Sequence, residues 1–86
     1  MNINELIAIV KKKLNENILI EKVKIEDKSF LHKNHPGNQK GKFHLKITIN
    51  SKELSLLNKV DSNKRIHKAL EREIKEHIHS IQILIL

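Results

Sequence analysis

The amino-acid sequence predicts an α+β domain in which helices cover one face of a three-stranded sheet. Apolar residues recur at helical spacing near the start and in the second half of the chain, and they alternate with polar residues in the middle. Five of the last eight residues are isoleucine or leucine, which is typical of a strand. The predicted order is α-β-β-α-α-β. With 86 residues, the chain can build one core, so we expect a single domain, residues 1–86.

The first helix is predicted over residues 2–14. Its apolar residues share one helical face: Ile3, Leu6, Ile7, Val10 and Leu14. Asn2 is the expected N-cap, with Glu5 three residues later in the capping-box position. Lysines 11–13 are expected in the last turn, where positive charge stabilises the negative end of the helix dipole.

Two strands are predicted on either side of a long polar segment. Residues 18–27 alternate imperfectly between apolar and polar, whereas the alternation over residues 43–49 is regular. Because only residues 28–41 connect the two strands, we expect them to pair antiparallel. A loop of this length in a small domain is often functional.

The second half of the chain is expected to hold a short turn or helix at residues 51–60, then a longer helix. Asp61 or Ser62 is the expected cap of that helix. Its apolar stripe runs through Ile66, Leu70, Ile74 and Ile78. Residues 79–86 form the last strand, whose apolar character predicts that it is buried or covered by helices.

The composition narrows the class of function. The chain has seventeen basic and ten acidic residues, which gives a net charge of +7. Fifteen of the basic residues are lysines. This charge suits either a solvated surface or a footprint for an anionic partner. The absence of cysteine excludes disulfides and a thiol nucleophile. The sequence has no catalytic or phosphate-binding motif, signal sequence or membrane-spanning run. We therefore expect a non-enzymatic, soluble, cytoplasmic protein without a small-molecule substrate.

Two of the six histidines are the best candidates for metal chemistry. His35 lies in the polar segment, with His32 one turn before it, and His79 lies at the start of the last strand. A loop histidine and a strand histidine can converge on a metal if a partner supplies softer ligands. The alternative for His79 is a packed side chain at the sheet edge, on the same face as Ile81, Ile83 and Ile85. We expect the other three histidines to be exposed or half-buried: His44, His67 and His77.

Three separate segments resemble the BolA family. Residues 27–37 resemble its Asp-x-Ser-x-x-His-x-Gly-His-x-Gly loop. The similarity continues through Gly41, the strand at residues 43–47 and Ser51, and it closes with Ile-His-Ser-Ile at residues 78–81, which resembles the family's Val-His-Ala-Leu. The resemblance implies a class II KH-like fold.

The resemblance also implies a cofactor and a partner. Proteins of this family associate with monothiol glutaredoxins and share a [2Fe–2S] cluster across the interface. The implied ligands in this chain are His35 and His79, while the glutaredoxin supplies a cysteine and glutathione a second thiolate. His32, Lys64, Arg65 and Lys68 are the candidate contacts to a partner or to nucleic acid.

The chain departs from the family pattern where the long helix begins. Ser62-Asn63-Lys64, followed by Arg65, stands where members usually have Arg-His-Arg. The alternative function is a DNA-binding regulator, in which Lys64, Arg65 and Lys68 contact phosphates. This alternative lacks aromatic platforms for bases and a Gly-x-x-Gly clamp.

Overall fold

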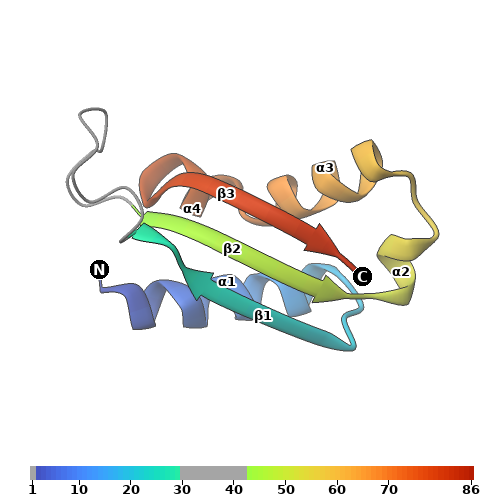
Figure 1. Ribbon diagram of the computed structural model, residues 1–86, viewed down its shortest axis with the longest axis horizontal. Helices are drawn as coiled ribbons and strands as arrows, with labels where there is room; N and C mark the ends of the chain where they lie inside the picture. The colour runs from blue at the N-terminus through green and yellow to red at the C-terminus, as the bar shows by residue number, and fades with distance from the viewer. Residues whose placement is uncertain (1, 30–42) are drawn as a thin grey trace.

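The computed structural model describes residues 2–29 and 43–86. The elements follow one another along the chain as α1 (Ile3–Asn17), β1 (Lys22–Asp27), β2 (Phe43–Asn50), α2 (Lys52–Ser55), α3 (Lys59–Ala69), α4 (Glu71–Glu76) and β3 (Ile78–Ile85). The sheet order is β1-β2-β3, with β1 antiparallel and β3 parallel to the central strand (Figure 1). The predicted α+β class with a three-stranded sheet is confirmed.

The core lies between the sheet and the helices. Leu45, Ile47 and Ile49 of β2 point to this side, and each is at most 2% exposed. Helix α1 contributes Leu6, Val10 and Leu14, and the second half of the chain contributes Leu54, Ile66 and Leu70. The opposite side chains of β2 are mostly polar, as regular alternation along a strand requires.

Helix α1 begins as predicted and ends later. Glu5 N–H donates to Asn2 Oδ1 at 2.8 Å, and Asn2 Nδ2 donates to Glu5 Oε1 at 3.2 Å, which confirms the cap. The helix continues to Asn17 instead of residue 14, so the lysine run is not in its last turn. Lys13 instead forms an ion pair with Glu73 of α4 at 2.6 Å.

The first strand is shorter than the sequence pattern indicates. Residues 18–21 lie between α1 and β1, and Ile18 caps the helix by donating its N–H to Leu14 O at 2.9 Å. Strand β1 then pairs with β2 from Lys22↔Asn50 to Asp27↔Leu45, which confirms the antiparallel prediction.

The predicted long helix is two helices. Asn58 caps α3 by accepting the Asp61 N–H at 2.8 Å, so the cap is neither Asp61 nor Ser62. At Leu70 the backbone leaves helical geometry (φ −108°, ψ 16°), which separates α3 from α4. Ile78 then begins β3 instead of ending a helical stripe.

The last strand is an edge strand. Strand β3 pairs only with β2 among the described elements, and its inward side chains pack partly against the core. The inward face of β3 is thus covered as predicted, whereas Leu84 on the outer face is 46% exposed, so the strand is not buried on both faces. No helix within the described residues is long and apolar enough to cross a membrane.

Candidate functional site

His79 is an extra residue in the last strand. Phe43 pairs with Ile78 and His44 with Ser80, so His79 has no partner of its own on β2 and forms a β-bulge. The His79 side chain is exposed. A bulge bends a strand locally and redirects a side chain, and here it presents an imidazole at the start of β3.

The bulge also resets the alternation of the strand. Ile78 faces the core, and after the extra residue Ile81, Ile83 and Ile85 face the core as well. His79 therefore does not share the face of these three isoleucines, and it is exposed at the edge of the sheet. The spacing in the sequence carries the signal, because Ile81 follows Ile78 by three positions whereas the later isoleucines follow one another by two.

His44 is the buried neighbour of His79. The two ring centroids lie 4.9 Å apart at an interplanar angle of 63°, an edge-to-face contact that restricts how the rings turn. His44 Nδ1 and Ser80 Oγ share a hydrogen bond of 2.6 Å. Backbone contacts also enclose His44, because its N–H donates to Ser29 Oγ at 3.1 Å and its carbonyl accepts from the Lys28 N–H at 2.7 Å.

The burial of His44 differs from the expectation for a polar strand face. This histidine is 5% exposed, although it lies on the face of β2 opposite to Leu45. The pattern of one strand shows which face a residue occupies and not what covers that face. Among the described residues, His44 contacts His79 and Ser80 of β3, and Lys28 and Ser29 directly after β1, all of them distant in sequence.

The other candidate histidines are distributed differently. His32 and His35 lie outside the described residues. His67 is exposed and His77 half-buried, as expected, and His77 Nε2 lies 3.7 Å from Glu76 Oε2. Within residues 2–29 and 43–86, no three histidine, aspartate or glutamate side chains gather where they could hold a metal.

The basic candidates all lie on α3 and are exposed: Lys64, Arg65 and Lys68. Arg65 Nη2 donates to Glu53 Oε1 at 3.3 Å. The Leu19 N–H holds the pKa of Glu53 below its ordinary value; desolvation opposes this effect, and Arg65 adds a smaller lowering. Arg65 is therefore paired within the chain, whereas Lys64 and Lys68 have no ion pair among the described residues. No described contact joins these side chains to His79.

A model of a known family matches most of the chain. The matching model is described as BolA-like protein and covers residues 14–86. This chain belongs to the BolA-like family. The match begins within α1 and includes the bulged strand with His79. No curated protein matches the sequence significantly.

Solved structures of BolA proteins have the same fold. BolA1 from Arabidopsis thaliana superposes with a TM-score of 0.77 at 21% identity, covering 93% of this chain and 88% of that one. The BolA domain of SufE1 from the same plant gives 0.76 at 20% identity, covering 99% and 92%. A bol-like protein from Babesia bovis gives 0.72 at 18% identity, covering 92% and 80%. At these identities the likeness shows the BolA fold.

The described part of the site is suited to supplying one ligand to a metal held with a partner. The His79 imidazole is exposed on a regular element, and the edge-to-face contact with His44 restricts its motion. The whole chain lacks cysteine, so any thiolate ligand must come from another molecule. An exposed imidazole in this position can therefore ligate a metal together with groups that another molecule supplies.

Proposed function

We propose that this chain is a non-enzymatic adaptor that binds a monothiol glutaredoxin and shares a [2Fe–2S] cluster with it. It would act in cytoplasmic iron–sulfur assembly, cluster trafficking or iron regulation. Membership of the BolA-like family supports this proposal. The observation that carries it is the exposed imidazole of His79 on a β-bulge, held against the buried ring of His44.

Four ligands complete the proposed site. This chain contributes His79 and His35, the glutaredoxin contributes a cysteine, and glutathione contributes a thiolate. Two neutral imidazoles on one iron raise the reduction potential of such a cluster relative to ligation by thiolates alone. Binding is expected to weaken in acid, because a protonated imidazole cannot ligate iron.

The residues around His79 position it in this proposal. The bulge separates the imidazole from the inward row of isoleucines, and His44 restricts its orientation. His44 is itself fixed by Ser80 through Nδ1 and by its backbone contacts to Lys28 and Ser29. Such supporting contacts around a ligand commonly alter metal affinity by about 10- to 100-fold when removed.

DNA binding is the alternative function and has weaker support. Lys64 and Lys68 are exposed on one helix and can contact phosphates. Arg65, the better reader of bases and phosphates, is paired with Glu53. Binding through the two lysines alone would be weak and would show no preference among sequences.

Anaerobic cluster reconstitution tests the proposal. The chain is mixed with a monothiol glutaredoxin and glutathione, and the cluster is followed by visible absorption and circular dichroism, with complex formation checked by size exclusion. His79→Ala and His35→Ala are expected to return the spectrum to that of the glutaredoxin alone. His77→Ala is the matched control, because this neighbouring histidine contacts Glu76 and lies outside the bulge.

Two outcomes would count against the shared cluster. One is a cluster spectrum that neither His79→Ala nor His35→Ala changes, and the other is the absence of any complex. Titration with duplex DNA of several sequences at two salt concentrations then tests the alternative. A preference among sequences that Lys64→Ala and Lys68→Ala abolish would favour DNA binding.

A further inference from the structure

The outer edge of β3 presents unpaired backbone groups. In the parallel ladder, Leu86 N–H donates to Ile49 O at 2.8 Å, so the even-numbered residues from Ser80 to Leu86 direct their N–H and C=O groups toward β2. The odd-numbered residues between them, Ile81, Ile83 and Ile85, direct theirs away from the sheet. Within the described part of the chain no other strand pairs with this edge.

From Ile81 to Ile85 the edge carries no charge, proline or bulge that would protect it against a further strand. Natural edge strands commonly carry charged residues or proline, or are very short. Strand β3 has eight residues, and none of them is lysine, arginine, aspartate, glutamate or proline. The bulge at His79 lies at the beginning of the strand, so the part from Ile81 to Ile85 remains regular.

A basic groove follows helix α3 and meets the end of strand β3 near residues 83–86. A cavity of about 450 Å³ lies between the two elements and is lined by Lys59 and Asn63 of α3 and by residues 83–86. The next hollow shares Lys59 and Asn63 and continues along α3 through Val60, Lys64 and His67. A third shares His67 and ends on α4; it is lined by His67, Lys68, Glu71, Ile74 and Lys75. We call these three hollows the α3–α4 groove.

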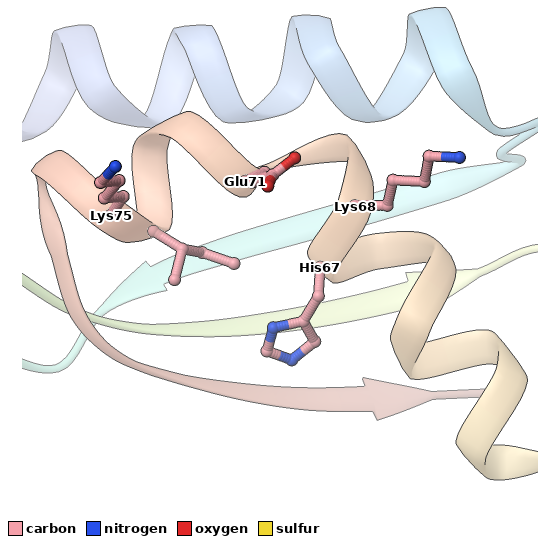
Figure 2. A pocket seen from close by; sticks show the side chains of 5 residues that line it. His67, Lys68, Glu71 and Lys75 are labelled. Carbon is pink, nitrogen blue, oxygen red and sulfur yellow. The ribbon is translucent and has the colours of Figure 1, made fainter.

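The charges of the groove favour an acidic occupant. Lys59, Lys64, Lys68 and Lys75 line it, and Glu71 is the only acidic residue among its lining residues. Figure 2 shows Lys68, Glu71 and Lys75 on the α3–α4 segment, together with the His67 ring. Val60 is 63% exposed and offers an apolar contact among the lysines.

We propose that β3 accepts an extended, acidic segment of a partner protein as a fourth strand. The backbone of the segment would pair with Ile81, Ile83 and Ile85. Its side chains on the helix-covered side would place carboxylates against the lysines of the α3–α4 groove. Strand addition of this kind takes its affinity from backbone hydrogen bonds and its specificity from alternate side chains. The inference goes beyond the proposed function, because it requires neither a cluster nor His79.

A second copy of this chain fits the same edge poorly. A two-fold pairing of β3 with β3 would form one continuous sheet with the helices of both copies on the same face. The lysines of one α3–α4 groove would then face those of the other. Like charges in such a contact oppose association, whereas an acidic segment neutralises them.

Amide hydrogen exchange with a synthetic peptide tests the proposal. The probe is an acetylated and amidated eight-residue peptide of alternating glutamate and valine, added to the full chain and followed by NMR. We expect exchange at Ile81, Ile83 and Ile85 to slow by about tenfold or more at saturation. Exchange at Gln82 and Leu84 should not change, because these residues already bond to β2. Val23 and Ile25, at the outer edge of β1, should not change either.

Charge reversal distinguishes peptide binding in the α3–α4 groove from general attraction of an acidic peptide to a basic protein. The double variant Lys64→Glu/Lys68→Glu is expected to weaken peptide binding by about tenfold or more in fluorescence anisotropy. The matched control is Lys22→Glu/Lys24→Glu, which makes the same charge change on β1. A peptide of alternating lysine and valine should not bind.

Three results would overturn the proposal. The first is the absence of any protection at Ile81, Ile83 and Ile85 when the acidic peptide is present at millimolar concentration. The second is an equal loss of affinity in both double variants, which would mean attraction to net charge alone. The third is a dimer in sedimentation velocity that protects these three amides without peptide, which would make a second copy the occupant.

Discussion

The two outer edges of the sheet are built differently. Strand β1 carries four charged residues among six, and Glu26 pairs with Lys24 at 3.0 Å and with Lys28 at 3.5 Å. Strand β3 has no acidic or basic residue other than His79, and the nearby charge lies on α3 and α4. One edge thus carries its own protection against a further strand, while the other leaves its backbone open beside a row of lysines.

The difference between the edges also concerns how firmly each is anchored. Ile25 of β1 is 9% exposed and belongs to the buried core, whereas Ile83 of β3 only packs partly against it. We therefore expect Ile25→Ala to cost about 3 kcal/mol and Ile83→Ala about 1–2 kcal/mol, because the deeper site loses more contacts and leaves a larger cavity. Urea unfolding of both variants measures this. Equal losses would show that the two edges are equally anchored.

An ion pair joins the helices that pack against the two edges. Lys13 of α1 contacts Glu73 of α4, whose side chain is 6% exposed, and Glu73 Oε1 is buried without a hydrogen-bond partner. Removing the lysine leaves a buried carboxylate uncompensated, so Lys13→Ala is expected to cost about 1–2 kcal/mol in chemical denaturation. Lys12→Ala, one position earlier and exposed, should change stability by less than about 0.5 kcal/mol. A similar loss in both would mean that the ion pair contributes nothing.

Adding a charge to the β3 edge and removing one from the β1 edge should have opposite effects on the association of the protein. Gln82 is exposed on β3, so Gln82→Lys places a charge on the open edge, whereas Lys24→Gln removes one from β1. We expect the first change to reduce light scattering at high protein concentration and the second to increase it, with the free energy of unfolding altered by less than about 0.5 kcal/mol. The comparison between the edges fails if Lys24→Gln has no effect and Gln82→Lys raises the scattering.

The smallest expected effect is on the stability of the protein as the pH is lowered. Lys24, and then Lys28, hold the pKa of Glu26 below its ordinary value of 4.5, although desolvation opposes them. A lowered pKa in the folded state means that the stabilisation is present above pH 4.5 and is lost as pH falls through the folded value. Glu26→Gln should therefore lower the urea midpoint slightly at pH 7, and this effect should shrink as the pH falls below 4.5. Glu16→Gln, which removes no described ion pair, is the control and should not change the midpoint.

Local signals in the sequence predicted the elements that depend on local interactions. Asn2 and Glu5 stabilise the start of α1 through neighbours three residues apart, and the alternation from Phe43 to Ile49 predicted β2. The break at Leu70 was missed because Ile66, Leu70 and Ile74 keep helical spacing on both sides of it. The cap was misplaced because Asp61 and Ser62 are themselves good cap residues.

The candidate site was predictable only in part. His79 was selected from the resemblance and from its place before an apolar run. The burial of His44 and its contact with His79 could not be predicted, because they depend on the register between β2 and β3. The α3–α4 groove was missed for a similar reason, since its lysines alternate with polar residues that predict only an exposed face.

The bulge has a consequence for how this imidazole could be gained or lost. Because His79 is the inserted residue, its removal would leave Ile78, Ser80, Ile81, Gln82 and Ile83 in unbroken inward and outward alternation, with His44 still opposite Ser80. A single-codon deletion would thus remove the side chain and make the ladder regular, without shifting any later residue to the wrong face. The potential ligand is an addition to a strand that is complete without it. The histidine can therefore be gained or lost in evolution without a change in the packing of β3.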